Sequence, residues 1–190
     1  MSVSHGTMVQ NILRHYRKAT PATVAAGESW YAAAREAAAL IYPERPDIAA
    51  KVIAQLSPRC QWSTNVQWAS AIVTAARNGQ ECPSVHTKAM RSAAWAFATG
   101  TRQDAPTGPK ISRFYRNIMG DMSCATVDVW AARAAEGSRV KRDANGQEVA
   151  PTGTRYAAIE RAYIRAADIA GTSPSMMQAV TWIVVRGRAA

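Results

Sequence analysis

The chain has 190 residues, 48% of them hydrophobic, which is long enough for one domain to bury a core without disulfides or metals. Its 23 lysines and arginines outnumber 13 aspartates and glutamates, and the formal net charge of +10 favours a polyanionic partner such as nucleic acid. No stretch approaches the roughly 20 apolar residues of a membrane span, and no apolar run near the first residue resembles a signal peptide, so we expect no contact with a membrane.

Five helices are predicted before residue 100, at about 8–18, 23–41, 46–56, 64–77 and 85–98. Apolar and alanine-rich positions recur there at spacings of three and four residues, which is the helical period. Pro46 suits the first turn of its helix, and Ser57-Pro58 ends that helix because the residue before a proline disfavours helical backbone. Ser63 is expected to cap the fourth helix.

Four further helices are predicted at about 109–119, 129–135, 156–170 and 174–185. Gly171 is expected to end one helix, and Ser173-Pro174 to start the last. The polar segment 136–154 holds Asn145-Gly146, a typical tight turn, and predicts a short β-hairpin near 139–149. We therefore expect residues 1–190 to form a single all-α domain of eight or nine helices.

Neither the cysteines nor the loops indicate a bound cofactor. Cys60, Cys82 and Cys124 lie far apart without a CxxC pair, which argues against zinc or an iron–sulfur cluster. No glycine-rich nucleotide-binding loop is present. We expect no cofactor and no metal, and the unpaired cysteines favour a reducing, cytoplasmic location.

Two charged residues stand at the starts of successive predicted helices. Gly108 and Lys110 begin one, where backbone N–H groups after a glycine suit a phosphate. Asp128 precedes the next, in a position typical of a helix cap. We expect Lys110 and Asp128 to face one cleft.

This pattern resembles the helix-hairpin-helix DNA glycosylase superfamily, which includes endonuclease III-like and oxoguanine-type members. Gly108 and Lys110 match its Gly-x-Lys hairpin, and Val127-Asp128 matches its aspartate motif. The segment LSPRCQWSTNV, residues 56–66, is similar to a segment that opens an early helix in the same superfamily. The resemblance covers about residues 48–135 and implies a glycosylase-like core there, with the N-terminal and C-terminal helices packed on it.

The resemblance implies a chemistry for both residues. The target nucleotide would be flipped out of double-stranded DNA that carries a modified or damaged base. Lys110 would attack the sugar carbon and form a Schiff base, which requires its pKa to fall from about 10.4 towards roughly 7–8. Asp128 would stabilise the positive charge that develops on the sugar or help to move a proton.

Three departures from the family pattern keep a second reading open. The hairpin reads Asp104-Ala105-Pro106-Thr107-Gly108, with one glycine fewer, Trp130 stands where the family often has histidine, and the four-cysteine cluster is absent. The chain is also similar to phage thymine-hypermodification transferases of the same fold. In that reading Lys110 and nearby arginines would hold pyrophosphate, and Asp128 would orient or deprotonate the incoming amine. A non-catalytic DNA-binding protein is the third reading.

We expect the protein to be a monomer in a bacterial cell, encoded by the bacterium or by a phage. Other candidate DNA-binding residues flank these motifs. Polar side chains after residue 58 would fill the gap left by a flipped base, arginines and lysines would contact phosphates, and an aromatic ring would line the base pocket. Each of these side chains has an alternative role without DNA: it caps a helix, packs in the core or is solvated. The predicted DNA-binding residues are Gly108, Arg59, Gln61, Trp62, Asn65, Arg113, Lys141 and Arg142, and the predicted pocket residue is Trp130. Trp182 is predicted to pack in the core, and His86 is given no role.

Overall fold

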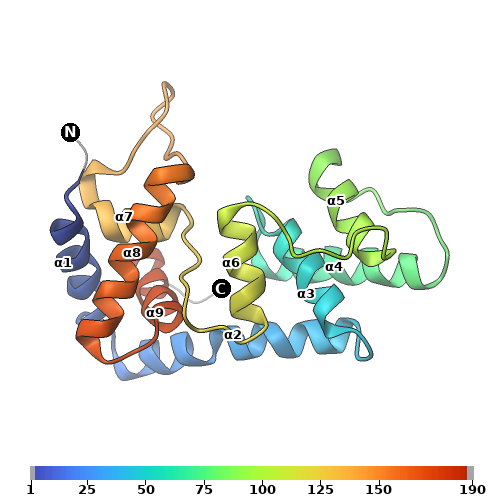
Figure 1. Ribbon diagram of the computed structural model, residues 1–190, viewed down its shortest axis with the longest axis horizontal. Coiled ribbons are helices and arrows are strands. Elements are labelled where there is room, and N and C mark those ends of the chain that lie inside the picture. Colours follow the sequence, from blue (N-terminus) through green and yellow to red (C-terminus); the bar gives the residue numbers. More distant parts are fainter. Residues whose placement is uncertain (1–2, 188–190) are drawn as a thin grey trace. The chain divides into compact units, whose positions relative to one another are not determined.

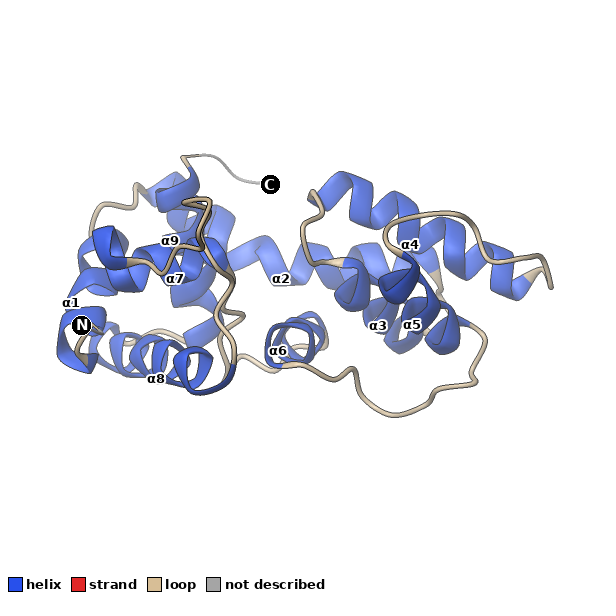
Figure 2. Ribbon diagram, turned by 90° about the horizontal axis from the view of Figure 1, so that it is seen from above, coloured by secondary structure: helices blue, strands red, loops and turns tan. Residues whose placement is uncertain are grey.

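The computed structural model describes residues 3–187, and within them the protein is all-α (Figure 1). Nine α-helices and one short 3-10 helix account for its regular structure, and no strand occurs in the described residues (Figure 2). The predicted class and number of helices are confirmed. The α-helices are α1 (His5–Tyr16), α2 (Pro21–Ile41), α3 (Pro46–Leu56), α4 (Trp62–Arg77), α5 (Lys88–Ala98), α6 (Pro109–Ile118), α7 (Val129–Glu136), α8 (Gly153–Ala170) and α9 (Pro174–Arg186).

Most helix ends follow from local chemistry. Pro46 begins α3 and Pro174 begins α9, where the Ser173 side chain accepts a hydrogen bond from a backbone N–H group. Gly171 ends α8 in the left-handed conformation, as predicted. The predicted cap at Ser63 is wrong, because the chain has already returned to extended backbone at Gln61 and α4 begins directly after it.

Packing divides the described chain into two compact units. The first holds residues 3–30 and 121–187, and the second holds residues 31–120, so that α2 contributes to both. The predicted core of 48–135 falls across both units, and the single domain over 1–190 stays a prediction. None of the helices within residues 3–187 is long and apolar enough to cross a membrane.

In the first unit, α1, α7, α8 and α9 pack around one apolar core (Figure 1). Ile12, Tyr163 and Met177 are completely buried there. The N-terminal part of α2 joins this unit through Gly27, where an added Cβ would lie 2.4 Å from Cγ2 of Val180 and 2.9 Å from its backbone nitrogen. Only a glycine allows α2 to approach α9 this closely.

In the second unit, α3 lies between its neighbours α4, α5 and α6. All of α3 from Ala49 onwards is buried, including the polar Lys51 and Gln55. Ile53 and Leu56 of α3 and Phe97 of α5 are buried in its core. The end of α6 is held by Arg35 of α2, whose Nε donates to the Ile118 carbonyl at 2.9 Å.

The segment between α7 and α8 does not form the predicted hairpin. One isolated antiparallel bridge joins Arg142 and Glu148, around a turn in which the Asp143 carboxylate accepts from two backbone N–H groups. The segment is polar and lacks the apolar cross-strand pairs that stabilise a two-stranded ribbon. Ion pairs hold it instead, from Glu148 to Arg133 and Arg142.

Candidate functional site

Lys110 lies in the second unit, on the first turn of α6. Gly108 precedes this helix with φ of 89°, a conformation that favours glycine. The Lys110 amine is part-buried, and Nζ donates to the carbonyl of Ser57 at 3.3 Å. Ser57 belongs to the other sequence motif, residues 56–66. The two stretches that the sequence analysis singled out, residues 56–66 and the start of α6, are therefore in contact through Lys110 and Ser57.

Residues 58–60 form a strained turn beside this contact. Arg59 is exposed and has φ of 55°, although non-glycine residues rarely adopt positive φ. The carbonyl of Pro58 lies 2.9 Å from Nε2 of His86, and Nδ1 of His86 accepts from the backbone N–H of Thr87 at 2.7 Å. These contacts assign the ring proton to Nε2, so His86 donates to Pro58.

His86 is a residue that sequence reasoning missed. Its hydrogen bond to the Pro58 carbonyl holds the turn that carries Arg59, and its own φ is 54°. The ring centroids of His86 and Trp68 lie 5.3 Å apart. The partner carbonyl is 28 positions away in the chain. No local pattern signals such a contact, so the sequence alone could not have revealed it.

The predicted DNA contacts near this turn occupy different environments. Gln61 is exposed at the start of α4, and Trp62 after it is part-buried. Asn65 is only 2% exposed, and its Nδ2 donates to the Ile53 carbonyl at 3.1 Å. Asn65 therefore links α4 to α3 inside the unit, and its predicted contact with DNA gains no support from this position.

Two polar atoms near these contacts are buried without a partner in the described residues, Oγ of Ser57 and Oδ1 of Asn65. Burial also raises the pKa of the Cys60 thiol, which the nearby Lys110 ammonium lowers in part. A raised pKa keeps the thiol protonated at neutral pH, so Cys60 is not an activated nucleophile.

Asp128 lies in the first unit and caps α7, as the sequence predicted. Its Oδ1 accepts from the backbone N–H of Ala131 at 2.8 Å. Its Oδ2 accepts from the indole Nε1 of Trp182 at 3.0 Å. Both oxygens are thus held by donors from different parts of the fold, and Trp182 does more than fill the core.

Tyr163 lies next to this carboxylate and is completely buried. Its hydroxyl lies 3.3 Å from the Ala131 carbonyl and 3.2 Å from Oγ1 of Thr181. Burial raises the pKa of Tyr163 far above its usual range, Thr181 lowers it in part, and the charge of Asp128 raises it further. The phenol therefore stays neutral and does not serve as a base near neutral pH.

The remaining candidates in the first unit are only partly available. Trp130 is part-buried, and the Arg133 guanidinium lies 4.2 Å from its ring centroid. Lys141 and Arg142 are both exposed, and Arg142 is bound to Glu148 and to the Gly146 carbonyl.

Arg113, the remaining predicted phosphate contact, is part-buried on α6 in the second unit. The structure thus groups the candidates in two places. The residues around Lys110 belong to the second unit, and Asp128 and Trp130 belong to the first. The common cleft of Lys110 and Asp128 stays a prediction.

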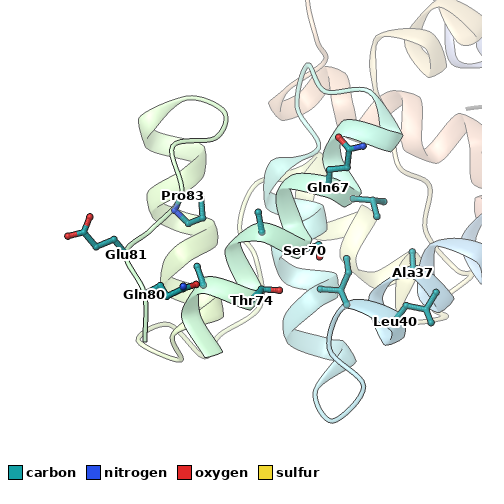
Figure 3. Close-up of a pocket in the computed structure, with 12 residues that line it drawn as sticks. Ala37, Leu40, Gln67, Ser70, Thr74, Gln80, Glu81 and Pro83 are labelled. Carbon is teal, nitrogen blue, oxygen red and sulfur yellow. The ribbon is translucent and has the colours of Figure 1, made fainter. Parts of the chain in front are cut away.

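A groove of about 1030 Å³ elsewhere in the second unit contains none of the predicted residues. Figure 3 shows Ala37 and Leu40 of α2 on one side and Gln67, Ser70 and Thr74 of α4 on the other. No lysine or arginine lines this groove. Because nucleic-acid sites are strongly basic, the groove does not have the chemistry of one.

The model of DUF7178, a family of unknown function, matches residues 1–189, and the chain belongs to this family. No curated protein and no solved structure matches the chain.

Proposed function

We propose that this member of DUF7178 acts on bases of double-stranded DNA, as an N-glycosylase in which Lys110 attacks the sugar and Asp128 assists. One observation carries the proposal: the Lys110 amine contacts the Ser57 carbonyl at 3.3 Å. Two stretches that resemble motifs of a base-excising family are thereby joined through residues 53 positions apart.

The surroundings of Lys110 suit an extended polyanion. Arg59 is exposed on the adjacent turn, and Gly108 opens the N-terminus of α6, where backbone N–H groups favour a phosphate. The net charge of +10 adds a long-range attraction for DNA. We infer that Arg59 and the start of α6 contact the backbone on either side of the target nucleotide.

The proposed reaction is a displacement at the sugar. The neutral amine of Lys110 donates its electron pair to C1′ while the bond from C1′ to the base nitrogen breaks. The base leaves with the electron pair of the broken C1′–N bond and takes up the proton that the attacking amine loses, and the Asp128 carboxylate stabilises the positive charge that develops on the sugar. Opening of the sugar ring then gives a Schiff base, which water hydrolyses to an abasic site and the free amine.

A borohydride trap tests the proposal, because borohydride reduces a Schiff base to a stable crosslink. Wild type, Lys110→Ala and Lys88→Ala would be incubated with duplexes that carry uracil, 5-hydroxymethyluracil, oxidised guanine or an oxidised pyrimidine. Lys88 is an exposed lysine at the start of α5, so its variant controls for the loss of one charge. We expect crosslinks with wild type and Lys88→Ala and none with Lys110→Ala.

Other outcomes would redirect the assignment. A crosslink that survives in Lys110→Ala would show that a different amine reacts. Tight binding of duplex by wild type without any crosslink would overturn the lysine mechanism. The next assay would then be transfer of an amine to a 5-hydroxymethyl pyrimidine with an activated phosphate ester, in which pyrophosphate is released.

A further inference from the structure

The Asp128 carboxylate is held at both oxygens, and only one of the two contacts is local. The Ala131 N–H group binds Oδ1 as an ordinary helix cap. Trp182, 54 positions later in the chain, donates its indole N–H to Oδ2 at 3.0 Å. A cap alone leaves the carboxylate free to turn about its Cβ–Cγ bond, whereas a second donor fixes the plane of the group.

Trp182 is itself fixed from several sides. Its ring stacks on that of Trp30, with centroids 6.0 Å apart and planes 16° from parallel. The Arg186 guanidinium lies 4.5 Å from the Trp182 ring centroid, a distance typical of a cation–π contact. The indole N–H is therefore aimed by packing, and its direction does not depend on Asp128 alone.

The close approach of α2 and α9 makes this arrangement possible. Gly27 lies against Val180, where a Cβ atom would collide with backbone. Trp30 follows Gly27 by about one helical turn, and Trp182 follows Val180 by two residues, so the contact of Gly27 brings the two rings together. A glycine in α2 thus contributes to the orientation of a carboxylate on α7.

We propose that Trp182 is a positioning residue for Asp128, which holds the carboxylate plane so that its remaining lone pairs keep one fixed direction. This inference rests on the proposed function, in which Asp128 stabilises the positive charge that develops on the sugar. A misplacement of about 1 Å can lower a rate roughly 100-fold. If Trp182 only packs, replacing it with phenylalanine should change the reaction rate little, because phenylalanine keeps an aromatic ring.

The first experiment tests the contact without any substrate. The indole N–H signals of the six tryptophans would be recorded by NMR in wild type and in Trp182→Phe, which identifies the Trp182 signal. Asp128→Ser would then be examined, because serine can still cap α7 but is too short to reach the indole. We expect the Trp182 signal to move upfield and to exchange faster with water. A signal that does not respond would overturn the inference.

The second experiment tests the role in the reaction. Single-turnover rates of base release and duplex affinities would be measured for Trp182→Phe on the duplex from which wild type releases the base fastest. Trp95→Phe is the matched control, a part-buried tryptophan on α5 in the second unit. We expect Trp182→Phe to lower the rate about 10-fold to 100-fold with affinity unchanged, and Trp95→Phe to change neither.

The outcomes separate the two proposals. If Asp128→Ala loses activity and Trp182→Phe keeps the wild-type rate, the positioning role is wrong and the proposed function stands. If Asp128→Ala keeps full activity, or wild type releases a base from none of the duplexes, the proposed function fails. The indole signal then still decides whether Trp182 holds the carboxylate.

Discussion

Both oxygens of Asp128 accept hydrogen bonds from fixed donors, whereas the region around Lys110 contains strained backbone and a buried hydroxyl without a partner. In the described part of the chain, Arg59 and His86 are the non-glycine residues with positive φ, and both lie near Lys110. Strain of this kind costs of order 1–2 kcal/mol per residue and is retained where the rest of the structure enforces it.

The two regions orient their exposed or candidate side chains in different ways. The carboxylate of Asp128 is fixed by hydrogen bonds that also stabilise the first unit. The turn that presents Arg59 is fixed at the expense of stability in the second unit. Substitutions near Asp128 should therefore destabilise the protein, whereas removal of strain near Lys110 should stabilise it and weaken function.

Gly27→Ala should have the largest effect on stability. Its Cβ would lie 2.9 Å from the backbone nitrogen of Val180, so α2 and α9 must separate. We expect the free energy of unfolding to fall by about 3 kcal/mol, as in overpacked cores, measured by urea denaturation. Gly6→Ala in α1 is the control, because nothing lies within 4 Å of its Cβ, and it should be neutral or stabilising. Equal stability of the two variants would contradict the close approach.

Asp128→Ala should be the next most destabilising change. It removes the cap of α7 and leaves the Trp182 N–H without its acceptor, and we expect a loss of about 2 kcal/mol. Asp128→Ser keeps a capping oxygen and should lose roughly half as much. Thermal and urea unfolding of the two variants would measure the difference. If Asp128→Ser keeps the stability of wild type, the Trp182 contact contributes nothing to stability, and if both variants lose the same amount, the cap contributes nothing.

Tyr163 should make the first unit sensitive to alkali. Its folded pKa is raised by burial above the value of about 10 in the unfolded chain. Its contribution to stability is thus complete below about pH 10 and is lost above it, by up to about 1.4 kcal/mol per pH unit. Tyr163→Phe should show a shallower loss between about pH 9 and pH 11 in urea unfolding. Identical slopes for variant and wild type would refute this assignment.

His86→Phe tests how the strained turn is held. The substitution keeps the aromatic ring beside Trp68 but removes the donor to the Pro58 carbonyl and the acceptor for Thr87. We expect about 1 kcal/mol of lost stability. If His86 acts on DNA binding only through Arg59, His86→Phe should add little to the loss caused by Arg59→Ala. A double-mutant cycle on duplex affinity measures this coupling, and additive losses would exclude it.

Arg59→Gly should have the smallest effect on stability, and of opposite sign. Glycine adopts positive φ without strain, so we expect a gain of about 0.5 kcal/mol after the larger entropy of the unfolded chain is counted. Arg59→Ala keeps the strain and should leave stability nearly unchanged. Both variants should bind duplex DNA about tenfold more weakly at low salt, with a smaller salt dependence. A stable Arg59→Gly variant with wild-type affinity would remove Arg59 from the DNA contacts.

Local sequence determined most of the helices and the position of Asp128 as a helix cap. Helical periodicity predicted eight or nine helices, of which residues 3–187 contain nine α-helices, and Pro46, Pro174 and Gly171 mark helix ends because their backbone preferences act within one turn. Asp128 was recognised as a cap for the same reason. The hairpin prediction is wrong because a tight turn at Asn145-Gly146 does not by itself hold two strands together, and one isolated bridge forms instead.

Tertiary structure alone decided which distant groups meet. The contacts of Lys110 with Ser57, of His86 with Pro58 and of Trp182 with Asp128 join residues 53, 28 and 54 positions apart. Each depends on how whole helices pack, and a single close approach such as that of Gly27 to Val180 can set it. The sequence named the charged groups, since their types and local positions are written in it. Their contact partners are set only by folding, because residues about 50 positions apart meet only when the helices that carry them pack together.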